Sequence, residues 1–414
     1  MNKKPVAVVL GGTNPHVALI ENLKTRGYST VLVDYYANPP AARVADKHIR
    51  ESTLDLEKVL AVAKQTDAIL VISTCVDQAN VTACYVAEKL GLPAPYSYKT
   101  ALNVTDKRIM KNMMLEGGVP TSRYIVVDKT GDSQVASLTF PVVVKPSDSN
   151  GSKGVKKTYN LSELDKGLCA AFDISRAGTA IVEEFCEGKE ISVDCFVQNQ
   201  KAHVIMLRQK YNMIYNEDSV IACYASIAPA KVSSETTRAI QKIAGDISRI
   251  FGLDNTSLLI QLMVDGDKIK VIEFAPRVGG GLSYRTVKLN TGFDILDATI
   301  NSYLGVPSIL EYSMPEIYYS ANNVYAFTGV FGSAENYQQL IKDGVIEEYY
   351  PHKTRGMEIG SDMASRDRVC SFVAQDRDEK ALLSKIKKTI DTLDIYDLDG
   401  RSIIKRDIYV KELI

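Results

Sequence analysis

Short β-branched apolar runs alternate with amphipathic stretches through the first hundred residues. Strands are expected at Val6 to Leu10, Thr30 to Val33 and Ala68 to Ile72, and helices at about His16 to Arg26 and Leu54 to Lys64. This alternation predicts consecutive βαβ units, which need a parallel sheet with helices packed on its faces. Residues 1–100 are therefore expected to form an α/β domain.

The turn after the first strand contains Gly-Gly-Thr-Asn-Pro-His, from Gly11 to His16. It lacks the third glycine of G-x-G-x-x-G, and no G-x-x-x-x-G-K-[ST] occurs in the chain, so neither a Rossmann dinucleotide site nor a P-loop is indicated. Two interpretations remain open. The segment is either a plain tight turn or a substrate-facing loop at the carboxyl end of the strand, where open α/β sheets bind ligands.

Two prolines, Pro93 and Pro95, mark a break in the pattern. A helix is then expected from Thr105-Asp106 to about Glu116, because Gly117-Gly118 is a typical helix C-cap signal. A second domain is accordingly predicted to begin near residue 100.

The remainder of the chain divides into a strand-rich part and a mixed part. From Tyr124 to Glu273 strands predominate, with helices at about Ser162 to Phe172 and Glu235 to Phe251. This pattern predicts an α+β body over residues 101–310, which ends after a helix at about Ile295 to Leu304. Residues 311–414 resume strand and helix alternation and are expected to form a third, α/β unit.

Composition excludes several classes of function. The chain has 49 basic and 50 acidic residues, a formal net charge of -1, and no Lys/Arg block that would track a nucleic acid backbone. No apolar run approaches the length of a membrane span or a signal peptide. Seven dispersed cysteines without a C-x-x-C pair are typical of free thiols in a reducing compartment. We expect a cytoplasmic protein without membrane or nucleic acid partners.

A buried strand that delivers a lysine into a polar, glycine-containing loop is expected between Pro141 and Val155. Its sequence is Pro-Val-Val-Val-Lys-Pro-Ser-Asp-Ser-Asn-Gly-Ser-Lys-Gly-Val, in which the lysine is Lys145. Such a loop can bring backbone N–H groups close to phosphate oxygens while the lysine supplies a point charge. The alternative interpretation is a strand that ends in a surface turn.

A second pair of strands is expected on either side of an acidic connection between Ala180 and Asp194. The connecting backbone can present donors and acceptors to a planar base, with Glu190 placed for sugar hydroxyls. A surface connection with solvated acids is the alternative.

A third pair of strands is expected from Leu258 to Val264 and from Lys268 to Pro276. If the loop between them has three residues, Val264 faces Lys268, Gln261 lies opposite Val271, and Glu273 is a diagonal neighbour on the same face. An oxygen pair from Gln261 and Glu273 would then converge, as Mg²⁺ demands. A register slip of one residue would turn Gln261 to the other face.

These three segments, taken in order, resemble the ATP-grasp superfamily over about residues 3 to 310. The similarity rests on Lys107 in Thr-Asp-Lys-Arg-Ile-Met-Lys, the Val-Val-Val-Lys-Pro loop, Glu-Glu-Phe-x-x-Gly-x-Glu, and Glu-Phe-Ala-Pro-Arg ending at Arg277. The resemblance implies a pre-ATP-grasp α/β domain, a central ATP-grasp domain that binds ATP and Mg²⁺, and a C-terminal α/β domain.

The resemblance also implies a role for individual residues. Lys107 and Lys145 would contact the ATP phosphates, and Arg277 would steady the acyl phosphate. Arg277 and Lys145 are the candidate catalytic residues. The other implied ATP ligands are a phosphate-covering loop, an adenine-binding hinge and a ribose ligand: Ser149, Gly151, Ser152 and Gly154; Glu183, Glu184, Phe185 and Cys186; and Glu190. Gln261 and Glu273 would bind one or two Mg²⁺ ions.

Two departures from the superfamily pattern concern the metal site. Gln261 stands where a carboxylate is frequent, and Ala275 stands where asparagine is frequent. Both changes remove metal-binding oxygens or charge and leave the number of Mg²⁺ ions open. Gln occurs at the first position in carbamoyl phosphate synthases, and an E-x-A-x-R pattern occurs in L-amino-acid ligases.

The segment after Arg277 narrows the choice within the superfamily. Its triglycine, Gly279 to Gly281, is similar to that of carboxylate-amine ligases, whereas purine-pathway carboxyaminoimidazole ribonucleotide synthases have P-H-N-S-G-H there. Arg277 and Arg285 are then candidate partners of a bound carboxylate, and Arg208 to Tyr224 is a candidate loop facing the triphosphate or the acceptor. The alternatives are a mobile triglycine loop and a plain surface loop.

The resemblance thus implies a ligase that joins a small carboxylate to an amine through an acyl phosphate, with ADP and phosphate released. A homodimer is compatible with this reading. The alternatives are a nucleotide-binding regulatory protein with the same fold, an ATP-grasp carboxylase, or a carbamoyl phosphate synthase-like enzyme.

Overall fold

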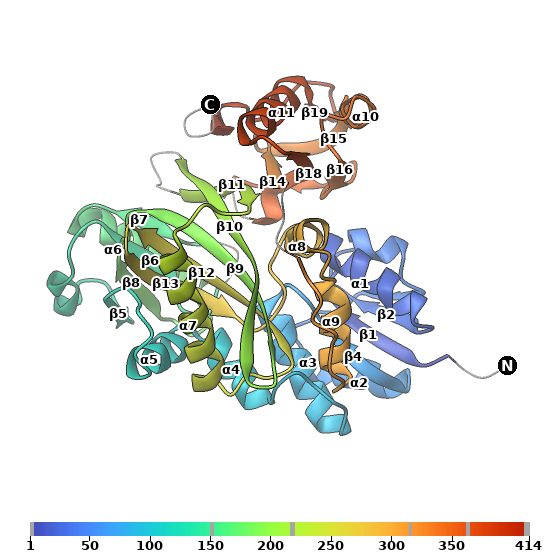
Figure 1. Ribbon diagram of the computed structural model, residues 1–414, viewed down its shortest axis with the longest axis horizontal. Helices are drawn as coiled ribbons and strands as arrows, with labels where there is room; N and C mark the ends of the chain where they lie inside the picture. Colours follow the sequence, from blue (N-terminus) through green and yellow to red (C-terminus); the bar gives the residue numbers. More distant parts are fainter. Residues whose placement is uncertain (1–3, 150–152, 216–219, 314–316, 362–364, 410–414) are drawn as a thin grey trace.

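The computed structural model describes residues 4–149, 153–215, 220–313, 317–361 and 365–409. Figure 1 shows the N-terminal residues, in blue, beside the strand-rich central residues, in green and yellow, with the C-terminal residues, in orange and red, above both. The predicted combination of α/β and α+β structure is confirmed, because a parallel sheet and a large mixed sheet are both present.

The N-terminal sheet is parallel, with strand order β3-β2-β1-β4. Its strands are β1 (Val6–Leu10), β2 (Ser29–Val33), β3 (Lys47–Ile49) and β4 (Ala68–Ile72). The covering helices are α1 (Asn14–Thr25), α2 (Leu56–Gln65) and α3 (Asp77–Leu90). The predicted strands and helices are therefore present, while β3 and α3 were not predicted. A parallel sheet covered on both faces explains why β1 is apolar throughout.

A helix from later in the chain also covers this sheet. Helix α9 (Ile295–Tyr303) places Ile300 and Tyr303 in the same core as β1 and β4. The Tyr303 hydroxyl donates to Asn80 Oδ1 of α3 at 2.6 Å. The N-terminal sheet and the central part of the chain are thus packed together rather than joined by a free linker.

The large sheet has 12 strands among the described residues, and its main path runs β13-β12-β9-β10-β11-β7-β6-β8-β5. These strands are β5 (Tyr124–Val127), β6 (Val142–Pro146), β7 (Lys156–Thr158), β8 (Ala180–Glu184), β9 (Lys189–Gln198), β10 (Lys201–Tyr215), β11 (Val220–Ala228), β12 (Thr256–Asp265) and β13 (Lys268–Ala275). Among the described residues, strands β7 and β11 meet through one pair, Lys156 and Val220. The path therefore consists of two antiparallel layers that are only narrowly joined.

Separate helices cover the two layers. Helix α6 (Leu161–Ile174) packs on β6 and β8, whereas α4 (Tyr98–Thr105), α5 (Lys107–Glu116) and α7 (Ser234–Ile250) share a core with β9, β12 and β13. The Asp106 side chain caps α5 by accepting from Arg108 N. This cap begins the helix immediately before Lys107, as the sequence predicts.

The loop between β12 and β13 is shorter than the sequence analysis expected. Asp265 pairs with Lys268, and Val264 therefore lies opposite Ile269. The expected pairing of Val264 with Lys268 across a three-residue loop was wrong. A two-residue turn suffices because Gly266 adopts a positive φ of 55°, a conformation that costs glycine little.

A register shift farther along the same hairpin brings the two predicted metal ligands together. Leu262 lies opposite Val271, but an extra residue in β13 then places Gln261 directly opposite Glu273. The predicted pairing of Gln261 with Val271 was also wrong. The β-bulge shifts the register by one residue, so the two side chains are direct rather than diagonal neighbours.

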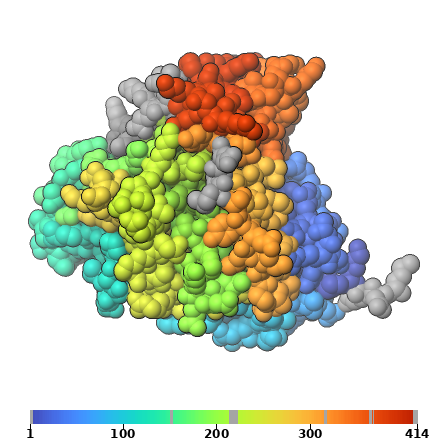
Figure 2. Space-filling model, viewed as in Figure 1, coloured from blue at the N-terminus to red at the C-terminus, as the bar shows by residue number. Residues whose placement is uncertain are grey.

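The C-terminal residues extend the large sheet instead of forming a wholly separate one. Strand β14 (Tyr318–Tyr325) pairs with β11, and β18 (Arg368–Asp376) joins β14 to β16 (Glu348–Pro351). A small sheet contains β15 (Gly329–Glu335), β17 (Glu358–Ile359) and β19 (Asp394–Asp397), with helices α10 (Tyr337–Lys342) and α11 (Glu379–Thr392) nearby. Figure 2 shows these orange and red residues above the green and yellow ones.

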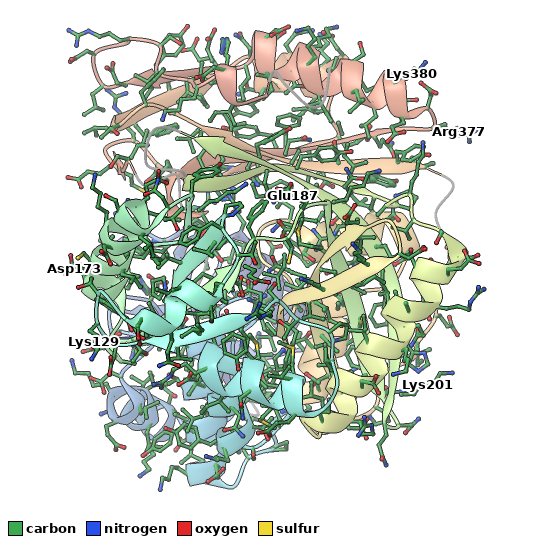
Figure 3. All side chains as sticks on the ribbon, turned by 90° about the vertical axis from the view of Figure 1, so that its left-hand side faces the viewer. Lys129, Asp173, Glu187, Lys201, Arg377 and Lys380 are labelled. Carbon is green, nitrogen blue, oxygen red and sulfur yellow. The ribbon has the colours of Figure 1, made fainter. Side chains whose placement is uncertain are left out.

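The molecular surface carries many charged side chains. Figure 3 shows Lys129, Asp173, Lys201 and Lys380 at the periphery of the molecule, whereas Glu187 lies nearer the middle of this view. In the part of the chain that the structure describes, no helix has the length and apolar character needed to cross a membrane.

Candidate functional site

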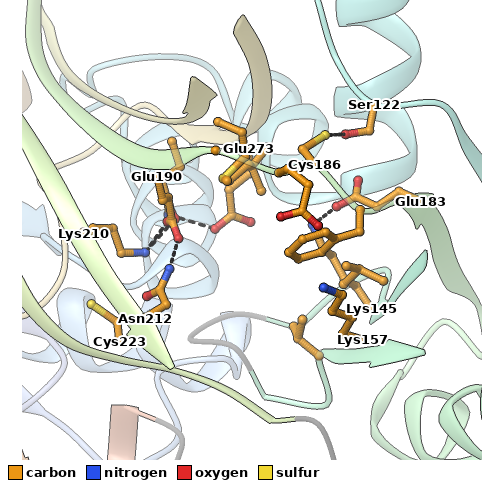
Figure 4. A pocket seen from close by; sticks show the side chains of 18 of the residues that line it. Ser122, Lys145, Lys157, Glu183, Cys186, Glu190, Lys210, Asn212, Cys223 and Glu273 are labelled. Atoms are coloured by element: carbon orange, nitrogen blue, oxygen red, sulfur yellow. Dashed lines mark hydrogen bonds and ion pairs between the residues drawn. The ribbon is translucent and has the colours of Figure 1, made fainter. Parts of the chain in front are cut away.

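A cavity of about 760 Å³ lies between the two layers of the large sheet. It contains most of the predicted nucleotide and metal residues: Lys107, Lys145, Ser149, Glu183, Glu184, Phe185, Cys186, Glu190, Gln261 and Glu273. Figure 4 shows Lys145 and Glu183 on one side of it and Glu190 and Lys210 on the other. Residues far apart in sequence, such as Lys107 and Glu273, therefore face the same space.

The loop after β6 is only partly described. Gly151 and Ser152 lie outside the described residues. Ser149 accepts a hydrogen bond from Lys107 Nζ through its backbone oxygen, so the start of the loop lies against α5. Gly154 has a φ of +74°, and a side-chain carbon there would meet Ile174 at 2.6 Å, which explains the glycine at this position.

A buried cluster of two lysines and one carboxylate lies at one side of the cavity, where Lys145 and Glu183 line it. Lys145 Nζ pairs with Glu183 Oε1, and Lys111 Nζ pairs with Glu183 Oε2 at 2.7 Å. Lys111 also donates to Thr121 Oγ1 at 3.0 Å. The sequence analysis missed Lys111, although its spacing from Lys107 places both lysines on one face of α5.

Lys111 and Lys145 keep the buried Glu183 carboxylate ionised. Burial raises the pKa of Glu183, but Lys111 and Lys145 outweigh that effect and lower its pKa from 4.5 to about 2. Burial lowers the pKa of Lys111 despite the nearby Glu183. The pKa of Lys145 is raised, because the charge of Glu183 outweighs burial. Glu183 is accordingly an ionised acceptor held in a fixed orientation.

The connection between β8 and β9 lines one side of the cavity. The Glu184 carboxylate turns away toward Arg123 and accepts from Thr139 N at 3.1 Å. Phe185 lies over the ammonium group of Lys157, which is 3.5 Å from the ring centroid. Cys186 Sγ is 3.0 Å from Ser122 Oγ. An aromatic ring, a thiol and backbone groups therefore line this side of the cavity.

Glu190 lies across the cavity and is held by two donors. Lys210 Nζ and Asn212 Nδ2, both on β10, each donate to its carboxylate. Lys210 also donates to Gln261 Oε1 at 3.1 Å. The prediction of a loop from Arg208 to Tyr224 was wrong, because the described residues of this segment belong to strands β10 and β11. Six of them line the cavity: Gln209, Lys210, Tyr211, Asn212, Cys223 and Tyr224.

Gln261 and Glu273 lie side by side next to Lys107, with the Gln261 amide nitrogen toward Glu273 and its oxygen toward Lys210. Gln261 Nε2 donates to Glu273 Oε1 at 3.0 Å, and Lys107 Nζ is 3.7 Å from Glu273 Oε2. One carboxylate and one amide oxygen suit Mg²⁺, which in nucleotide sites takes one or two protein oxygens together with phosphates and water. The chemistry of the two side chains is thus suited to a magnesium ion, and Lys107 carries a positive charge beside them.

Arg277 occupies a smaller recess that adjoins the cavity and shares Lys107, Gln261 and Glu273 with it. Its guanidinium group forms a bidentate pair with Asp77, with N–O distances of 2.8 and 3.0 Å. The pKa of Asp77 is lowered, because Arg277 outweighs the opposing effect of burial. Asp77, which begins α3, was not predicted, and no motif around it signals this partnership.

Two other arginines considered in the sequence analysis are engaged elsewhere. Arg208 is buried and forms a bidentate pair with Asp194, and its guanidinium also donates to Ser283 Oγ at 3.0 Å. Arg285 pairs with Glu348 of β16. Neither arginine lines the cavity among its described residues. Both hold together elements that surround the site.

The triglycine leads into helix α8 (Ser283–Thr291), and its first residue is tightly packed. A side-chain carbon at Gly279 would meet Ser283 Oγ at 2.5 Å and Arg208 at 3.3 Å, whereas one at Gly280 meets nothing within 4 Å. We expect Gly279→Ala to lower the free energy of unfolding by about 1–3 kcal/mol through overpacking. Gly280→Ala is the matched control. Equal stability of the two variants in urea titrations would contradict this packing.

Comparison with protein families places a known domain over this site. Residues 138–285 match the family described as "ATP-grasp domain". This segment contains Lys145, Glu183, Glu190, Gln261 and Glu273, and so covers most of the cavity.

Curated relatives match with modest identity. The D-alanine–D-alanine ligase of Bacteroides fragilis is 27% identical over 169 residues, which are 40% of this chain and 49% of the relative. The formate-dependent phosphoribosylglycinamide formyltransferase of Pyrococcus furiosus is 25% identical over 291 residues, which are 68% of this chain and 66% of the relative. The chain thus spans about half of the first relative and just under two thirds of the second.

Solved structures share the fold over nearly the whole chain. The L-amino acid ligase from Bacillus licheniformis has a TM-score of 0.77 and 18% identity, with 96% of this chain and 100% of that one covered. The phosphoribosylglycinamide synthetase from Anaerococcus prevotii has a TM-score of 0.74 and 18% identity, with 95% and 100% covered. The likeness shows a common architecture that includes the C-terminal residues.

Proposed function

Because this chain carries an ATP-grasp domain at residues 138–285, we propose that it is an ATP-dependent ligase that joins a small carboxylate to an amine. The reaction passes through an acyl phosphate and releases ADP and phosphate. The observation that carries the proposal is the convergence of Lys107, Lys145, Gln261 and Glu273 on one cavity. Cations and metal-binding oxygens from separate elements meet there as a transferring phosphoryl group requires.

The nucleotide lies with adenine against the β8–β9 connection and ribose near Glu190. The ionised Glu183 and the adjoining backbone are suited to the amino group and ring nitrogens of adenine, while Phe185 supplies an apolar face. Lys107 and Lys145 both line the cavity and would contact the phosphates. The similarity to a D-alanine–D-alanine ligase and the fold shared with an L-amino acid ligase support a ligase reaction.

Gln261 and Glu273 would hold Mg²⁺ on the phosphate side of the cavity. When bound, the ion would offset the negative charge of the β- and γ-phosphates. The chain would supply one carboxylate and one neutral amide, and phosphate oxygens and water would be needed as the other ligands.

The reaction has two group-transfer steps. A carboxylate oxygen of the first substrate attacks the γ-phosphorus of ATP, the bond to the β–γ bridging oxygen breaks, and ADP leaves. The amine nitrogen then attacks the acyl carbon, the acyl C–O bond breaks, phosphate leaves, and the amine proton passes to solvent. Lys107, Lys145 and Arg277 accelerate both steps by stabilising charge that develops on the phosphoryl and acyl oxygens.

Arg277 belongs on the acyl side of the site. Its bidentate partner in the described structure is Asp77, which presents the same two-oxygen geometry as a substrate carboxylate. A substrate carboxylate or acyl phosphate in the recess would therefore compete with Asp77 for the guanidinium group. The substrates that fit are small molecules with a free carboxylate and a free amine.

The direct test is ADP and phosphate release from MgATP by the purified protein, screened over pairs of amino acids and small carboxylates with amines. Release stimulated by one pair, with a condensed product seen by mass spectrometry, is the expected result. AMP and pyrophosphate as products would contradict the acyl-phosphate route.

A further inference from the structure

A chain of hydrogen bonds crosses from the N-terminal sheet to the nucleotide cavity by way of the C-terminal residues. Asn14 Nδ2 is 2.9 Å from His352 Nδ1, and His352 Nε2 is 2.7 Å from Ser371 Oγ. Ser371 Oγ donates to Asn323 Oδ1 at 2.9 Å, and Asn323 Nδ2 donates to Cys223 O at 3.1 Å. We call these five residues the relay. They come from α1, the end of β16, β18, β14 and β11.

Backbone carbonyls at both ends fix the direction of every bond. Cys223 O can only accept, so Asn323 presents its amide nitrogen to it and its oxygen to Ser371. Ser371 must then donate to Asn323 and accept from His352 Nε2. The imidazole therefore carries its proton on Nε2.

The contacts of Asn14, at the other end of the relay, require the same tautomer of His352. Asn14 Nδ2 donates to Pro351 O at 3.0 Å, which fixes the orientation of this amide as well. The same nitrogen can then only donate to His352 Nδ1, which must be unprotonated. A neutral imidazole meets both demands. Burial, with Arg368 and Lys353 nearby, lowers the pKa of His352 to about 3, in agreement with this state.

The two ends of the relay lie at functionally important places. Asn14 is the first residue of α1 and follows Thr13 in the turn after β1. Thr13 Oγ1 is 3.8 Å from Cys75 Sγ, and Cys75 stands two residues before Asp77, the partner of Arg277. Cys223 lines the nucleotide cavity and lies opposite Asn212, whose amide holds Glu190. The relay therefore joins the surroundings of Arg277 to the strand behind the ribose side.

We propose that the relay positions the wall of the nucleotide cavity relative to the turn after β1, so that His352 and Ser371 are positioning residues of the ligase. The inference rests on the proposed function. A chain of fully satisfied bonds with one possible direction holds its end groups more rigidly than separate bonds do. Loss of the central hydroxyl disrupts the whole path, whereas loss of an unrelated buried hydroxyl leaves it intact.

The test is the affinity of the full chain for MgADP, measured by isothermal titration calorimetry. We expect Ser371→Ala and Asn14→Ala each to weaken binding about three- to tenfold, the loss of one hydrogen bond. The double variant should bind no more weakly than the weaker single variant, because residues of one network are not additive. Ser320→Ala is the matched control. Ser320, in β14, is fully buried like Ser371, but it lies outside the relay.

Several outcomes would overturn the inference. Wild-type MgADP affinity in Ser371→Ala would do so, as would strictly additive losses in the double variant. Nitrogen NMR of the histidine side chains should show the Nε2–H tautomer for His352, identified by its disappearance in His352→Gln, and an Nδ1–H tautomer would contradict the direction of the relay. A wild-type protein that binds no MgADP would instead contradict the proposed function itself.

Discussion

Replacement of Glu273 by glutamine (E273Q) is expected to reduce Mg²⁺-dependent ADP release by roughly a hundredfold or more. Glu273 supplies the only carboxylate of the metal pair formed with Gln261, and the substitution removes its charge while it keeps the size of the side chain. Initial rates of ADP formation, measured across a range of Mg²⁺ concentrations, report the effect.

The matched control for this variant is Asp267→Asn. It removes an exposed carboxylate from the turn of the same hairpin, away from the cavity, and should leave the rate unchanged. Full activity of the Glu273 variant at low Mg²⁺ concentration would contradict the metal assignment. A loss of activity in both variants would point to a disturbed hairpin instead.

The Glu183→Gln substitution is expected to lower both the stability of the protein and its affinity for MgADP. The buried ammonium groups of Lys111 and Lys145 would then face a neutral amide, and breaking a buried ion pair costs about 3–5 kcal/mol in free energy of unfolding. The same variant should bind MgADP more weakly than the wild type, because adenine loses an ionised acceptor. Urea unfolding and calorimetry measure the two effects.

Glu184→Gln is the matched control for this change. Its carboxylate pairs with the exposed Arg123, and such surface pairs contribute about 0–1 kcal/mol. If the two variants lost the same small amount of stability, the buried cluster would not have the importance that its geometry indicates.

The same cluster predicts a dependence of stability on pH. The pKa of Glu183 falls from 4.5 to about 2 on folding, so its contribution to stability is fully present above pH 4.5 and is lost as the pH falls through about 2. The difference in unfolding free energy between the wild type and Glu183→Gln should therefore shrink between pH 4.5 and 2. A constant difference over that range would exclude the lowered pKa.

Much of the fold follows from local sequence signals. Strands β1 and β4 are apolar runs between amphipathic stretches, and helix α5 begins at a capping aspartate and ends before two glycines. Helix α8 was not predicted, because the triglycine before it indicated only a loop. The register of β12 and β13 was also wrong, since a bulge is set by how side chains pack and leaves no clear mark in the sequence.

Some residues of the candidate site can likewise be predicted from the sequence, and others cannot. Lys145, Glu183 and Glu273 stand in recognisable segments, and the structure brings them to one cavity as expected. Lys111 and Asp77 gain their importance only from partners far away in sequence, Glu183 and Arg277. A lysine in a helix and an aspartate at a helix start are ordinary surface residues until the tertiary fold surrounds them.

Strand β14 covers the edge of β11 through the pairs that run from Ala225 to Ala228. Ala225, Ile227 and Ala228 are fully buried. A shortened chain that ended before β14 would leave this apolar edge with free backbone N–H and C=O groups, which is a template for self-association between copies. By pairing with this edge, β14 leaves it unavailable for pairing with a second copy of the chain.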